Sequence, residues 1–121
     1  MSTPPNPPPP PPVDYDHFAA LDVRVGTVVD AQPFPEARKP AIRLWIDLGA
    51  PHGVKQSSAQ VTRHYKPDQL IGRQVCVVAN LPPRQVGPFS SEVLVLGLPD
   101  AAGEVVLVRP DHKVPNGGRL F

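Results

Sequence analysis

The chain has 121 residues, of which 40% are hydrophobic and 19% charged, and its formal net charge is +1. These values allow one packed domain and exclude a histone-like polycation. No apolar run approaches the roughly 20 residues of a membrane-spanning helix, and we expect no signal peptide because a basic flank and apolar core are missing. The single cysteine, Cys76, cannot form an internal disulfide, which predicts a reducing, cytoplasmic setting.

Proline is concentrated at the N-terminus. The chain contains 19 prolines, and residues 1–12 end in the run PPNPPPPPP. Such a run has nothing to bury and favours an extended polyproline II conformation. We therefore predict a disordered or stiff tail over residues 1–12 and one folded domain over residues 13–121. The alternative, a ligand for an SH3-like or WW-like groove, rests only on the P-x-x-P spacing.

The folded domain begins with a predicted helix and strand. Residues 14–21 (DYDHFAAL) can form a short helix, and residues 23–32 (VRVGTVVDAQ) alternate as a strand does. Simple alternation places Val29 on the same face as the preceding valines and turns Val28 to the other face. Gly26 inside the strand indicates a bulge or a tight bend.

Two more strands follow a proline-bounded loop over residues 33–40. Residues 41–49 (AIRLWIDLG) give the clearest strand pattern, with isoleucine and leucine on one face and Trp45 on the other. Residues 54–61 (VKQSSAQV) predict a third strand that is polar on average.

The second half of the chain predicts a short helix and three strands. Residues 64–72 suit a helix that ends at a glycine, and residues 73–81 form a strand that is apolar on both faces and therefore central. A long connection over residues 81–91 follows. Residues 92–98 and 104–110 then predict a hairpin around the turn PDAAG.

This order of elements predicts the fold class. Five or six short strands, one interposed short helix and glycines at bends favour a small closed barrel, and no β-α-β alternation supports a parallel sheet. We predict an all-β fold, a five-stranded OB-fold β-barrel with a short interposed helix and terminal extensions. A β-sandwich is the alternative, and the helix between the third and fourth strands favours the OB-fold.

The sequence carries no recognisable catalytic or metal-binding motif. Zinc sites need closely spaced cysteines and histidines, whereas this chain has one cysteine and four scattered histidines. It has no phosphate-cradling glycine loop with a lysine, and no serine sits in a strand–turn–helix elbow. We therefore expect a non-enzymatic protein without a metal or a cofactor.

Basic residues are concentrated in the middle of the chain. Residues 38–84 hold eight lysines and arginines against two aspartates, and three polar clusters, PEARKP, KQSSAQ and ANLPPRQVGPFSSE, interrupt the apolar pattern. Cations for phosphates, together with small donors and acceptors for base edges and 2′-hydroxyls, are typical of an OB-fold nucleic-acid site. A solvated face is the alternative. Trp45 and Phe89 can serve either as stacking planes or as packing residues.

The span from about Phe18 to Phe121 resembles the tRNA-binding domain family, which includes the C-terminal appendage of methionyl-tRNA synthetases and free-standing dimeric tRNA-binding proteins. The segments that carry the resemblance are LDVRVGTVVDAQPFPEARKP, KQSSAQV, IGRQVCVVANLPPRQ, SSEVLVLG and VPNGGRL. The forms FPEARKPA, KQSSAQ and NLPPRQVGPFSSEVLVLG are most similar to the CsaA branch, described as protein-export-related chaperones.

The resemblance implies an OB barrel, a homodimer built from terminal extensions, and a tRNA-binding groove on each subunit. The groove positions of the family fall on Arg38, Lys39, Ser57, Ser58, Asn80, Arg84, Ser90, Ser91 and Glu92. The expected partner is tRNA or another structured RNA. The alternative is a chaperone that holds unfolded or export-bound polypeptides in the same groove, because the connection PPRQVGPF is less basic than its counterpart in the synthetases.

Four apolar residues near the ends of the domain have no obvious partner in a five-stranded barrel. They are Phe18, Leu21, Leu120 and Phe121. We predict that they bury against a second copy of the chain across a two-fold axis.

Deleting residues 1–12 should leave the melting temperature and the association state of the protein unchanged, because the proline run buries nothing. Calorimetry and sedimentation of the full and shortened chains test this. A clear fall in melting temperature on deletion would show that the tail packs on the barrel.

Overall fold

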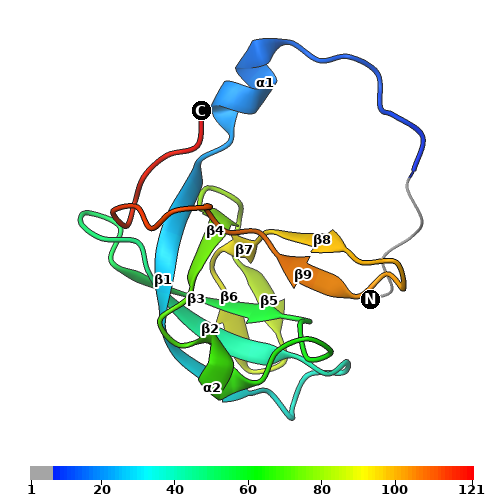
Figure 1. Ribbon diagram of the computed structural model, residues 1–121, viewed down its shortest axis with the longest axis vertical. Coiled ribbons are helices and arrows are strands. Elements are labelled where there is room, and N and C mark those ends of the chain that lie inside the picture. The colour runs from blue at the N-terminus through cyan, green and yellow to red at the C-terminus, as the bar shows by residue number, and fades with distance from the viewer. Residues whose placement is uncertain (1–6) are drawn as a thin grey trace.

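The computed structural model describes residues 7–121, and Figure 1 shows their arrangement. Residues 1–6 of the predicted tail lie outside the described residues, and residues 7–12 are exposed and have no regular secondary structure. The elements are α1 (Tyr15–Ala20), β1 (Val23–Pro33), β2 (Ile42–Asp47), β3 (Val54–Ala59), α2 (Pro67–Leu70), β4 (Gln74–Val78), β5 (Arg84–Val86), β6 (Phe89–Ser91), β7 (Leu94–Val95), β8 (Gly97–Pro99) and β9 (Val105–Leu107). Neither helix in this part of the chain is long and apolar enough to cross a membrane.

Five strands form one antiparallel sheet in the order β3-β2-β1-β4-β7, and the pairs β5–β6 and β8–β9 form two separate hairpins. The sheet curls into a nearly closed barrel (Figure 1). α2 follows β3 in the chain and precedes β4, and its Leu70 is fully buried in the barrel core. The predicted all-β OB-fold barrel with a short interposed helix is confirmed.

The long strand β1 bends, and its two halves pair with different strands. Its first half pairs with β4 and its second half with β2, with an irregularity between Val28 and Asp30. This bulge shifts the alternation by one residue. Val28, before the bulge, is 1% exposed, Val29 within it is 47% exposed, and Ala31 after it returns to the barrel core at 7% exposed. The bulge lies after Gly26 rather than at it.

Gly26 has a different role in the bend of β1. A Cβ at this position would lie only 2.6 Å from side-chain atoms of Ile46 and Leu48 on the neighbouring strand and the residue after it. The absence of a side chain allows the bent strand to approach β2 closely. The bend and the close packing together let five short strands curl around one core.

The connection over residues 81–91 is more regular than the sequence pattern indicated. Residues 84–86 and 89–91 pair as the hairpin β5–β6. Gly87 has a φ of 57°, which supplies the positive φ that a two-residue hairpin turn needs at its first position. The predicted hairpin of residues 92–98 and 104–110 is shorter than expected, because β7 pairs with β4 and only β8 pairs with β9.

Candidate nucleic-acid interface

A groove of about 930 Å³ lies between the loop over residues 34–41, the hairpin β5–β6 and the strands β7 and β9. Six of the predicted site residues line it, namely Arg38, Lys39, Ser58, Arg84, Ser91 and Glu92. The structure therefore brings together cations from two separate segments of the chain. Glu36, Gln60 and Gln85 also line the groove; they lie within the three polar clusters of the sequence but are not among the predicted site residues.

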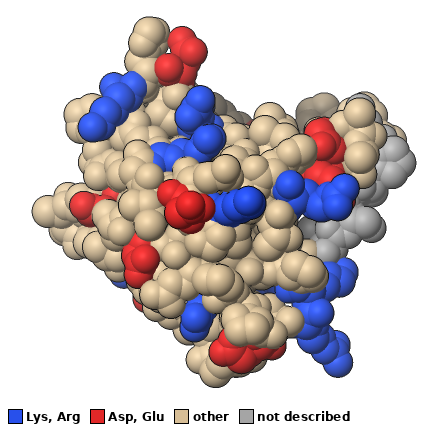
Figure 2. All heavy atoms as spheres, turned by 60° about the horizontal axis from the view of Figure 1, so that its bottom comes forward, with Lys and Arg blue, Asp and Glu red and all other residues tan. Residues whose placement is uncertain are grey.

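Positive charge is not spread evenly over the molecule. On the face shown in Figure 2, lysine and arginine side chains occur in separate groups with acidic side chains among them. The cations of the groove, Arg38, Lys39 and Arg84, are exposed. Because acidic side chains lie among the cations of the surface, an anion would be attracted only where cations are grouped, as Arg38, Lys39 and Arg84 are in the groove beside Glu36 and Glu92.

The serine and glutamate side chains of the groove also close the barrel. Ser57 is 1% exposed, and its Oγ donates a hydrogen bond to the backbone oxygen of Val93 at 2.7 Å. The Oγ of Ser91 accepts a hydrogen bond from the backbone N–H of Ser58 at 3.1 Å. Ser57 therefore lies beneath the groove rather than on its wall, and Ser90 is likewise not among the lining residues.

Glu92 also hydrogen-bonds to β3. We call these contacts between β3 and residues 91–93 the seam. The backbone N–H of Glu92 donates to the backbone oxygen of Gln56 at 2.8 Å, and its Oε1 accepts the backbone N–H of Gln56 at 3.0 Å. The Nε2 of Gln56 donates to the backbone oxygen of Ser90 at 2.8 Å. The second and third polar clusters of the sequence thus hydrogen-bond to each other, which holds one wall of the groove in place.

Three packed aromatic rings, which we call the aromatic cluster, connect the loop that carries Arg38 and Lys39 to the hairpin that carries Arg84. Phe34, Trp45 and Phe89 pack edge to face, with centroids 5.5 Å apart for the two phenylalanines and 6.0 Å apart for Trp45 and Phe89. Phe34 lies at the start of the Arg38 loop, Phe89 lies in the hairpin that carries Arg84, and both are more than 90% buried. Trp45 and Phe89 therefore pack against other rings.

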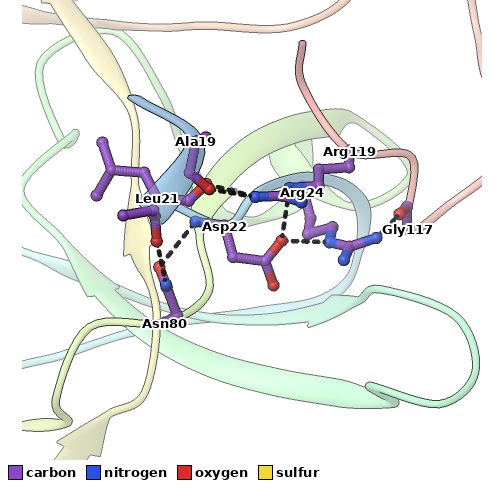
Figure 3. A network of polar contacts seen from close by, with 8 residues as sticks. Ala19, Leu21, Asp22, Arg24, Asn80, Gly117 and Arg119 are labelled. Atoms are coloured by element: carbon purple, nitrogen blue, oxygen red, sulfur yellow. Dashed lines mark hydrogen bonds and ion pairs between the residues drawn. The ribbon is translucent and has the colours of Figure 1, made fainter. Parts of the chain in front are cut away.

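Asn80 lies apart from the groove and binds the chain between α1 and β1 (Figure 3). Its Oδ1 accepts the backbone N–H of Asp22 at 2.8 Å, and its Nδ2 donates to the backbone oxygen of Ala20 at 2.7 Å. Both ends of the carboxamide are thus used within the protein. A contact of Asn80 with RNA stays a prediction.

The same network holds the C-terminal segment beside β1. The carboxylate of Asp22 pairs with Arg24 at 2.7 Å and with Arg119 at 3.5 Å. Arg119 also donates to the backbone oxygen of Ala19, the second-last residue of α1, at 2.6 Å. Figure 3 shows that Arg24 and Arg119 reach this carboxylate from different segments. The two ends of the domain are therefore joined through one acidic side chain, a feature that the sequence pattern did not reveal.

The residues predicted for a dimer interface gather at this end of the molecule, where the C-terminus lies beside α1 (Figure 1). Phe18, Leu21, Leu120 and Phe121 line one hollow of about 270 Å³. All four are exposed, and Phe121 is fully so. We call these four residues the terminal patch.

Cys76 and Asp100, two residues with a shifted pKa, lie outside the groove. Burial raises the pKa of the Cys76 thiol, and a hydrogen bond from His64 holds the pKa of Asp100 below its usual value. Neither residue lines the groove. Within residues 7–121, no three histidine, cysteine, aspartate or glutamate side chains are grouped so as to hold a metal ion.

Comparison with known proteins extends the geometric description. A family model described as a putative tRNA-binding domain matches residues 23–119. The methionine–tRNA ligase of Methanothrix thermoacetophila is 41% identical over 105 residues, which are 87% of this chain and 15% of the ligase. The chain thus spans about 15% of the length of the curated relatives it matches first.

Two solved structures match the chain over nearly its whole length. The chaperone CsaA of Bacillus anthracis is 51% identical with a TM-score of 0.85, over 92% of this chain and 100% of that one. The CsaA chaperone protein of Picrophilus torridus is 43% identical with a TM-score of 0.84, over 90% and 99% of the two chains. These neighbours consist of the same barrel and little else.

Replacing Phe89 with alanine should lower the free energy of unfolding by about 3 kcal/mol, because it removes the ring shared by the other two aromatics. Urea denaturation measures the change, and hydrogen exchange should show faster exchange in residues 84–91. Phe89→Leu, which keeps most of the apolar volume, should recover much of the stability. Unchanged stability of the alanine variant would contradict the fastening role of the aromatic cluster.

Proposed function

We propose, from the premise that this chain belongs to the putative tRNA-binding domain family, that it is a non-enzymatic protein that binds tRNA or another structured RNA. The observation that carries the proposal is the meeting of Arg38, Lys39 and Arg84 in one groove. Cations hold the phosphates, and neighbouring polar side chains such as Ser58 can reach base edges or 2′-hydroxyls. The cytoplasm, where tRNA is used, is the proposed location.

The chaperone function named for the CsaA neighbours is the weaker candidate for this chain. Aliphatic side chains in the groove are compatible with a bound polypeptide. The three cations on its rim and the family match favour RNA instead. Salt separates the two ligands, because phosphate binding weakens steeply as salt rises and apolar peptide binding does not.

The proposed assembly is a homodimer formed through the terminal patch. The Asp22 network holds α1 and the C-terminal segment so that Phe18, Leu120 and Phe121 are exposed at one end of the molecule. Isolated apolar residues on a surface are common, but four around one hollow are typical of an interaction site. A two-fold axis would let each patch cover the other.

Changing Arg38 and Lys39 together to alanine should weaken tRNA binding and reduce its salt dependence. About two phosphate contacts are lost, so the slope of log affinity against log salt should shrink by roughly 0.7 to 0.9 per contact. Fluorescence titration with labelled tRNA at several salt concentrations measures the slope.

The matched control for the loop variant is Arg63→Ala, which removes a cation that pairs with Glu104 and does not line the groove. It should leave affinity and slope nearly unchanged. Asn80→Ala tests the predicted contact of Asn80 with RNA, because a direct neutral contact would weaken binding with little change in slope. A parent protein that fails to bind tRNA at low salt refutes the proposed function, and peptide binding that survives the double substitution would then support the chaperone.

The intact protein at micromolar concentration should sediment with roughly twice the monomer mass. Phe18→Asp places a charge in the terminal patch and should give monomers. Leu98→Asp is the control, because Leu98 is 61% exposed and lies on the β8–β9 hairpin. A parent chain that stays monomeric at high concentration would rule out the dimer.

A further inference from the structure

Besides its cations and other polar residues, the groove is lined by aliphatic side chains. Leu81 and Leu94 are the large ones that remain open to solvent, at 40% and 50% exposed. Leu81 follows β4, and Leu94 lies in β7 directly opposite Val78 of that strand. We call Leu81 and Leu94 the leucine pair. Two exposed leucines within a groove rimmed by three cations need an explanation beyond core packing.

The exposure of Leu94 follows from strand alternation. Val93, the preceding residue, is 4% exposed and belongs to the barrel core. Successive side chains of a strand point to opposite faces, so Leu94 is turned out of the core. Its position does not serve the folding of the barrel, and a polar residue would be equally compatible with the backbone there.

The groove lacks the aromatic planes on which single-stranded nucleic acids usually stack. None of the groove-lining residues in the described range 7–121 is aromatic. Phe34 and Phe89 are buried in the aromatic cluster, and Trp45 packs against Phe89. Successive bases of a flexible single strand would therefore find few stacking partners here.

We propose that the leucine pair receives one unpaired base that a folded RNA already presents outside its helical stack. The base packs against Leu81 and Leu94, while Arg38, Lys39 and Arg84 hold the flanking phosphates. This inference rests on the proposed RNA-binding function and adds the class of ligand, a structured RNA with an extruded base. Continuous duplexes bury their bases, and unstructured strands would have to be ordered on binding.

The test compares three RNA probes by fluorescence titration. Two are hairpins with the same stem, one fully paired and one with a single extruded nucleotide, and the third is an unstructured oligouridine. The parent protein should prefer the hairpin with the extruded nucleotide over both other probes by about tenfold, the order of magnitude expected from burying one leucine-sized apolar surface.

Leu94→Gln and Leu81→Gln should each remove most of that preference without changing the salt slope, because no phosphate contact is lost. Leu98→Gln is the matched control, since Leu98 is an exposed leucine outside the groove lining, and it should bind as the parent does. Thermal melting checks that the variants fold. Because all three leucine side chains are exposed in the parent protein, we expect no large loss of stability.

Each result either supports or overturns the inference. Equal binding of both hairpins by the parent, or an equal loss for both hairpins in the glutamine variants, overturns it while leaving RNA binding intact. Conversion of the glutamine variants to monomers would assign the leucine pair to a subunit interface and also overturn it. If the parent protein binds none of the three RNA probes, the proposed function itself is refuted.

Discussion

The seam between β3 and residues 91–93 is the constraint on which the rest of the structure depends. β3 and β7 are the edge strands of the sheet, and the barrel is complete only when they are joined. The joint relies on side chains as much as on backbone, through Ser57, Ser91 and Glu92. An unpaired buried polar group costs about 1–3 kcal/mol, so each of these side chains satisfies a backbone group that would otherwise destabilise the barrel.

This seam also explains why a polar strand occurs in a small barrel. β3 carries Gln56 and two serines where an ordinary edge strand would carry apolar or charged residues. Their partners across the seam are equally polar, and the two sets satisfy each other. The groove wall is therefore held by hydrogen bonds within the protein before a ligand binds, and such preorganisation reduces the entropy lost on binding. The same residues can contribute to recognition only with the atoms that the seam leaves available.

The molecule has two separate surfaces with different chemistry. The groove combines cations with aliphatic side chains and is held by the aromatic cluster and the seam. The terminal patch is apolar and is held by the ion pairs of Asp22 with Arg24 and Arg119. Asn80 hydrogen-bonds to the backbone of Asp22, whose side chain holds the terminal patch, and the next residue along the chain, Leu81, lines the groove. The contacts that hold the terminal patch and the lining of the groove thus include adjacent residues after β4.

Local patterns in the sequence determined the strand order along the chain, the interposed helix and the segments that supply the cations. Alternation, turn residues and charge are properties of neighbouring residues, so they can be read without a structure. Motif resemblance added the family and six of the residues that line the groove.

Only the tertiary structure decided how the polar side chains are used. Asn80 and Ser57 have the same residue types as groove ligands, but their hydrogen bonds go to backbone atoms of segments distant in the chain. The bulge in β1, which leaves Val29 without a partner between Val28 and Asp30, lies within the pairing of β1 with β2. Such choices depend on which distant groups need a hydrogen-bond partner or a packing surface, and a linear pattern does not contain that information.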